Sequence, residues 1–85
     1  MFEITAGKGF QMTFANGWTV SVQFGDGNYC DNRFNANGEQ SSKTAEIAAW
    51  KGRDETWYQF DNATEVRGWV TADDVAKFIN LIANK

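Results

Sequence analysis

The sequence predicts an α+β fold: an antiparallel, mostly meandering sheet of about five or six strands, with one C-terminal helix packed on one face. Apolar and polar residues alternate along several segments, and a period of two is typical of half-buried strands. Turns that contain glycine, asparagine or aspartate separate these segments. Near the C-terminus the apolar spacing changes to that of one helical face.

Size and composition favour a single domain over residues 1–85 and exclude several kinds of chemistry. Aromatic residues make up 15% of the chain, and each can bury roughly 150–250 Å² in a core. Cys30 is the only cysteine, and the sequence has no histidine. An internal disulfide, a histidine-dependent catalytic site and the common zinc sites are therefore excluded within one chain. We expect no enzyme activity, no metal and no cofactor.

Two N-terminal segments are predicted strands, because their apolar residues stand at even positions. They cover residues 2–6 and 10–14. Residues 7–9 between them contain two glycines, which predicts either a hairpin turn or a bend in one long strand. A third segment, 18–24, alternates in the same way. We expect the even-numbered residues of all three segments to form one apolar face.

This shared parity predicts the turn between the second and third strands. A two-residue loop at 16–17 would set the apolar face of each strand against the polar face of the other. A three-residue loop at 15–17 instead pairs Met12 with Val20 and keeps the apolar residues on one side. Gly17 would then take the left-handed position of a turn with a bulge, where only glycine avoids a steric penalty.

A second hairpin is predicted from residues 44–50 and 56–60, with a turn near 51–54. The alanines of its first arm would also fit a helix. That arm is short for a helix, however, and glycine follows it, while the aromatic second arm favours a strand. After a further turn at 61–63, residues 65–70 are predicted to form the last strand.

The C-terminal helix is expected to begin at Thr71, whose hydroxyl can cap the amide of Asp73 or Asp74. Both acids lie in the first turn, where the helix dipole favours negative charge. The apolar stripe of the helix consists of Val75, Phe78, Ile79 and Ile82. This stripe needs an apolar surface to cover, and the even-numbered face of the sheet provides one.

Residues 25–34 are the candidate binding site, because this polar loop brings an aromatic ring, a thiol and an arginine directly after a strand. A polar loop on a rigid scaffold is the usual setting for binding residues. One helix covers only one face of a sheet, so a tryptophan on the other face, Trp50 or Trp57, can extend the contact surface. The predicted contact residues are Asp26, Asn28, Tyr29, Asp31, Asn32, Arg33 and Trp57.

These loop residues also have purely structural interpretations. Asp and Asn often form local turns through backbone amides, and the spacing of Asp26, Asn28 and Asp31 does not match a calcium-binding loop. Arg33 could activate Cys30 as a nucleophile. Because the chain has no histidine to act as a base, a buried and inert thiol is the favoured interpretation.

Charge and hydropathy restrict the partners. The net charge is −3, and the eight basic residues are scattered, which disfavours direct binding of nucleic acid. No segment has the length and apolarity of a membrane span, and the N-terminal residues lack the pattern of a secretory signal. We therefore expect a cytoplasmic protein without membrane contact.

Four segments together resemble small proteins encoded in bacteriophage and prophage genomes. They are Gly-Lys-Gly-Phe-Gln-Met-Thr-Phe at 7–14, Asn-Gly-Trp-Thr-Val-Ser-Val-Gln-Phe-Gly at 16–25, Gly-Asn-Tyr-Cys-Asp-Asn at 27–32 and Gly-Trp-Val-Thr-Ala-Asp-Asp-Val at 68–75. The resemblance implies an accessory role in the host cytoplasm. Very small phage proteins often block host defences there by covering a protein surface or by sequestering a signalling nucleotide.

The leading functional hypothesis is a non-catalytic binding protein that acts on a host protein through residues 25–34 and the adjacent sheet surface. The alternative is a binder of a nucleotide or another small ligand, held by Tyr29, Asn32, Arg33 and an exposed tryptophan. A homodimer is one arrangement that would suit the alternative. An exposed strand edge would serve a second copy of the chain as well as a foreign protein.

Overall fold

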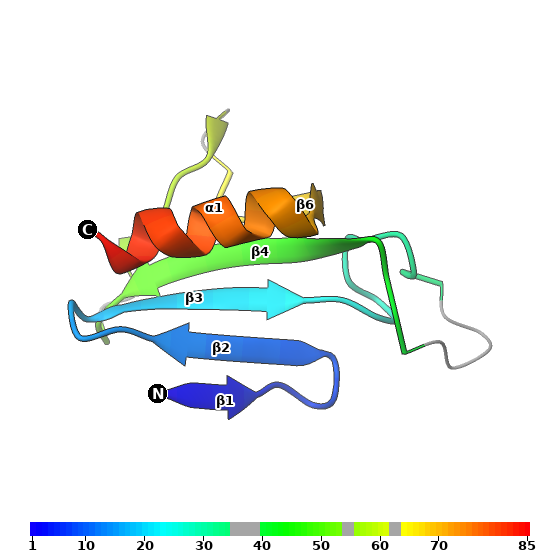
Figure 1. Cartoon of the computed structure of the whole chain (residues 1–85), viewed down its shortest axis with the longest axis horizontal. Coiled ribbons are helices and arrows are strands. Elements are labelled where there is room, and N and C mark those ends of the chain that lie inside the picture. The colour runs from blue at the N-terminus through cyan, green and yellow to red at the C-terminus, as the bar shows by residue number, and fades with distance from the viewer. Residues whose placement is uncertain (35–39, 54–55, 62–63) are drawn as a thin grey trace.

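The computed structural model describes residues 1–34, 40–53, 56–61 and 64–85. Within these residues the chain forms one antiparallel sheet with a helix on one face, as the sequence predicts (Figure 1). The elements are β1 (Phe2–Ile4), β2 (Gly9–Thr13), β3 (Trp18–Gln23), β4 (Thr44–Lys51), β5 (Thr56–Trp57), β6 (Arg67–Thr71) and α1 (Ala72–Ala83).

The first four strands form the predicted meander, in the order β1, β2, β3, β4. Residues 7–9 belong to a hairpin turn and not to a bend, because β1 pairs antiparallel with β2. Met12 pairs with Val20, and Gly17 has a φ of 89°. The register argued from parity and the left-handed glycine of the three-residue loop are both confirmed.

The second hairpin differs from the prediction at its far end. β5 ends at Trp57, whereas a strand was expected to continue to Phe60. The Tyr58 N–H still donates to the Ala49 carbonyl at 2.8 Å, but Phe60 turns under the helix, where it is 8% exposed. Burial of this aromatic ring explains why the chain leaves the edge of β4 there. Residue 54 of the predicted turn at 51–54, and residues 62–63 of the turn at 61–63, lie outside the described residues.

The helix begins as predicted, because the Thr71 Oγ1 atom accepts from the Asp74 N–H at 3.3 Å. Its buried residues are Val75, Phe78 and Ile82, which pack on the core residues of β3, β4 and β6. At its other end, the Asn16 side chain donates to the Ile82 carbonyl at 2.9 Å. The helix is thus fixed at both ends to the sheet.

The helix does not cover the whole apolar face (Figure 1). It lies over β3 and β4, while β1 forms the uncovered edge of the sheet. Phe2 and Ile4 occupy the same face as the core residues of β2 and β3, yet they are 74% and 84% exposed. The expectation that the helix would cover the even-numbered face is therefore met for β3 and not for β1.

Candidate functional site

A bulge in β6 changes the direction of Trp69. Ala45 pairs with Val70 and Ile47 with Arg67, so β6 has one residue more than β4 between these two pairs. Trp69 accommodates the extra residue with a φ of 52°, a left-handed conformation that is a genuine outlier for a bulky side chain. Bulges re-aim side chains in this way, and Trp69 is 55% exposed.

The 25–34 loop approaches β6 very closely at Gly68. A Cβ atom on Gly68 would lie 2.5 Å from the Tyr29 Cβ atom and 2.9 Å from the Tyr29 carbonyl oxygen. That carbonyl accepts from the Trp69 N–H at 2.8 Å. On its other side, the Tyr29 N–H donates to Glu46 Oε2 at 2.8 Å. Tyr29 is therefore tied to both β4 and β6, and the close approach requires glycine at position 68.

Cys30 and Asn32 form the buried base of the loop, at 1% and 8% exposed. The Asn32 Oδ1 atom accepts from the Gly25 N–H at 2.8 Å and from the Cys30 thiol at 3.1 Å. Its Nδ2 atom donates to the Ser41 carbonyl at 3.1 Å. These hydrogen bonds hold residue 25 at the start of the loop close to residue 41 at its end. Asn32 therefore stabilises the loop itself. The predicted burial of Cys30 is confirmed.

Above this base lies a row of side chains that we call the Arg33 cluster: Tyr29, Phe34 and Trp69, which are exposed, and Arg33, which is half-buried. The Tyr29 and Trp69 rings have centroids 5.7 Å apart and are tilted by 35°. The Arg33 Cζ atom lies 4.4 Å from the centroid of Tyr29 and 5.7 Å from that of Phe34. Tyr29 is 47% exposed and Phe34 is 87% exposed. The cluster thus presents three rings and one guanidinium to the surroundings.

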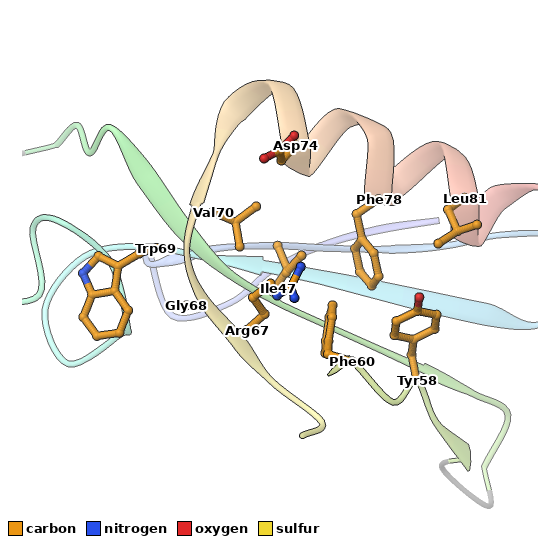
Figure 2. A pocket seen from close by; sticks show the side chains of 10 residues that line it. All are labelled: Ile47, Tyr58, Phe60, Arg67, Gly68, Trp69, Val70, Asp74, Phe78 and Leu81. Atoms are coloured by element: carbon orange, nitrogen blue, oxygen red, sulfur yellow. The ribbon is translucent and has the colours of Figure 1, made fainter. Parts of the chain in front are cut away.

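On the other side of β6 lies a groove of about 580 Å³ between the helix and the segment that follows β5. Figure 2 shows its side chains, with the Trp69 ring pointing away from it. The rings of Tyr58, Phe60 and Phe78 form one wall, with each pair of centroids 5.0 to 5.2 Å apart. Leu81 extends this wall and is 47% exposed.

Two charged residues line the same groove (Figure 2). The Arg67 Cζ atom lies 5.3 Å from the Phe60 ring centroid, and Arg67 pairs with Asp61 at 3.6 Å. Asp74 comes from the first turn of the helix and pairs with Lys77 at 3.8 Å. The volume of the groove lies in the range of pockets that bind small ligands. The groove and the Arg33 cluster are neighbours, since residues 68–70 separate them.

The structure brings together some of the predicted contact residues and separates others. Tyr29 and Arg33 are side by side in the cluster, and Asp26 and Asp31 lie exposed in the same loop. Asn28 is half-buried there, and its Nδ2 atom has no partner among the described residues.

Trp57 lies outside this group. Its ring is 4.9 Å from that of Trp50 on the face of the sheet that the helix does not cover. Sequence reasoning named Trp50 and Trp57 as candidates and did not place Trp69 beside Tyr29. The adjacent Gly68 was the one available signal, because a glycine before an exposed aromatic suggests a bulge or a close backbone approach.

Within the described residues, no three His, Cys, Asp or Glu side chains gather as they would around a metal ion. None of the described helical structure has the length and apolarity needed to cross a bilayer. Comparison with protein-family models, with curated proteins and with solved structures found no match.

Proposed function

We propose that this chain is a non-catalytic binding protein that holds a protein partner through the Arg33 cluster. The observation behind this proposal is the row of exposed Tyr29 and Trp69 with the half-buried Arg33 over the Tyr29 ring. Tyr, Trp and Arg are the residue types most enriched among the hot spots of protein interfaces. An isolated exposed aromatic is common on protein surfaces. Here the Arg33 guanidinium lies over Tyr29 and Phe34, and Trp69 lies beside Tyr29, so the four side chains form a contiguous contact surface.

The cluster also has the rigidity that a binding surface needs. The backbone of Tyr29 is bonded to Glu46 on one side and to Trp69 on the other. A partner therefore does not have to order the loop when it binds, and less free energy is lost on association. The left-handed Trp69 supports the same reading, because backbone strain in folded proteins is concentrated at functional positions.

The adjoining groove offers a second contact for the same partner. A side chain of the partner that enters it would meet the rings of Tyr58, Phe60 and Phe78. Burial of an apolar anchor in a pocket beside exposed aromatic residues is the usual arrangement at the centre of an interface. We expect the partner to cover both the cluster and the mouth of this groove.

The alternative is a nucleotide ligand, with a base stacked on Tyr29 or Trp69 and the phosphate on Arg33. Stacking on an exposed ring would support it. Against it stands the local charge, because Arg33 is the only cation in residues 25–34 while Asp26 and Asp31 are both exposed. The loop itself therefore offers a phosphate a single guanidinium, so a protein surface is the better fit.

The resemblance to phage-encoded proteins supports a host protein as the partner, in the host cytoplasm, with inhibition by covering a surface of a defence protein. The test is capture from host lysate on immobilised wild-type protein, Arg33→Ala and Lys77→Ala. Lys77 lies on the exposed side of the helix, so its variant is the control. Capture of one protein by wild type and Lys77→Ala, and not by Arg33→Ala, would support the proposal.

Native mass measurement of the protein purified from cells separates the two alternatives. A retained nucleotide that Arg33→Ala releases would favour the small-ligand binder. Equal capture of the partner by all three baits would refute the role of the cluster.

A further inference from the structure

The edge of the sheet opposite the Arg33 cluster is formed by β1 and carries exposed apolar side chains. β1 is the terminal strand of the sheet, and no described strand lies beyond it (Figure 1). Its Phe2 and Ile4 side chains are 74% and 84% exposed. Natural edge strands are protected by being very short, or by proline, bulges or charges that face inward. β1 is short, with three residues, but on its apolar side it has no proline and no charge.

Within the part of the chain that the structure describes, the backbone of β1 has groups along this edge that no other strand pairs. The N-terminal amine of Met1 donates to the Thr13 carbonyl at 2.9 Å, and the Thr13 N–H donates to the Met1 carbonyl at 2.8 Å. Pairs of residues that exchange two backbone hydrogen bonds occur at every second position of an antiparallel ladder. The next hydrogen-bonded pair along β1 is therefore Glu3 with Gln11. The N–H and C=O groups of Phe2 and Ile4 therefore point away from β2, where an added strand can bond to them.

The side chains of β1 determine which residues an added strand needs at each position. Phe2 and Ile4 lie on the apolar face of the sheet, and Glu3 lies on the opposite face. An added antiparallel strand would exchange hydrogen bonds with Phe2 and Ile4, which leaves Glu3 in a non-hydrogen-bonded pair. Side chains approach most closely in such pairs, so the residue opposite Glu3 has the strongest charge requirement.

A second copy of this chain does not meet that requirement. A two-fold pairing of β1 with itself that uses all three of its residues sets Phe2 opposite Ile4 and Glu3 opposite Glu3. Two like charges would then meet in the closest pair, which is unfavourable. A shift that places Glu3 opposite Thr5 needs an extended Ala6, whose φ is 50°. Self-pairing that uses all three residues of β1 is therefore unfavourable.

We propose that β1 accepts an extended segment of another protein, as an added antiparallel strand with the pattern apolar, basic, apolar. The basic residue would lie opposite Glu3, and its apolar neighbours would cover Phe2 and Ile4. Backbone hydrogen bonds would supply affinity and the alternate side chains would supply selectivity, as in other cases of strand addition. This proposal does not depend on the role of the Arg33 cluster.

Two synthetic peptides test it: Thr-Thr-Val-Lys-Val-Thr-Thr and the same peptide with Glu in place of Lys. Titration of the isotope-labelled protein, followed by NMR, gives a dissociation constant for each. We expect the Lys peptide to bind about twofold to fivefold more tightly than the Glu peptide, as cross-strand charge pairs allow. The amides of Phe2 and Ile4 should shift and exchange more slowly with solvent when the peptide is present.

Charge reversal provides the matched controls. Glu3→Lys should invert the preference between the peptides. Glu65→Lys makes the same change of net charge at an exposed position outside the sheet and should leave the preference unaltered. Inversion by both variants would show a net-charge effect and overturn the proposal.

Three further results would also overturn it: equal affinity of both peptides, no binding of either at millimolar concentration, or shifts confined to other strands. A dimer in which the Phe2 and Ile4 amides are already protected without peptide would assign the edge to a second copy instead.

Discussion

Replacement of Trp69 by glycine and by alanine should reverse the usual order of stability for a strand. Both variants lose the indole ring and its contact with Tyr29, so the difference between them depends on the backbone. At an ordinary strand position glycine is less stable than alanine by about 0.5–1 kcal/mol, because it loses more conformational entropy. Trp69 has a φ of 52°, where alanine is strained and glycine is not.

The magnitude follows from these two opposing terms. A left-handed residue with a Cβ atom costs about 1–2 kcal/mol, which exceeds the entropic disadvantage of glycine. We therefore expect Trp69→Gly to be more stable than Trp69→Ala by about 0.5–1 kcal/mol. For a domain of this size that difference corresponds to about 2–8 °C in Tm.

Thermal and urea unfolding of the two variants measure the difference directly. Arg67 lies exposed on the same strand and has no positive φ, so Arg67→Ala and Arg67→Gly form the control pair. There alanine should be the more stable by about 0.5–1 kcal/mol. If alanine is also more stable at position 69, the left-handed bulge is not present in solution and the account of the cluster fails.

Three other predictions concern the base of the site and the core. Gly68→Ala should lower the free energy of unfolding by about 1–3 kcal/mol, as overpacking does, because its Cβ would collide with Tyr29; a loss below about 0.5 kcal/mol in urea unfolding would argue against the close approach. Phe78→Ala should cost about 3–5 kcal/mol, since Phe78 is 7% exposed in the core; a loss of a few tenths would contradict that packing. Cys30 should react slowly with alkylating reagents in the folded protein, because it is 1% exposed; labelling as fast as in urea would refute its burial.

The sequence predicted the regular part of the fold because each feature there has a local cause. Even-numbered apolar residues set the register of Met12 with Val20, since a shift of one residue would turn every side chain to the wrong face. Thr71 and the two acids after it predicted the start of the helix, since these residues satisfy free amides and the helix dipole.

The rest of the fold depends on long-range contacts that local pattern does not encode. β5 was expected to reach Phe60, but burial of that ring against Phe78 outweighs strand propensity. The bulge at Trp69 contradicts the local preference of a bulky residue. It depends on Gly68 meeting the loop near Tyr29, which is about forty positions away in the sequence.

Only part of the candidate site was predicted, because its arrangement also depends on long-range contacts. Tyr29 and Arg33 were both named as contact residues of the loop, and the structure places the half-buried Arg33 over the exposed Tyr29 ring. Asn32 was named with them, but its amide is used to close the loop. Trp57 was expected near the site, whereas Trp69 occupies that place. Sequence reasoning identified the loop, but the structure was needed to show which tryptophan lies beside it.

The most direct test of the Arg33 cluster is titration calorimetry of a captured partner with wild-type protein, Tyr29→Ala, Arg33→Ala and Lys77→Ala. Truncation of a hot spot costs about 2 kcal/mol or more, which corresponds to a loss of about 30-fold in affinity. We predict that loss for Tyr29→Ala and Arg33→Ala, with Tm nearly unchanged, and wild-type affinity for Lys77→Ala. Wild-type affinity in all three variants would contradict the claim that the cluster is the contact surface.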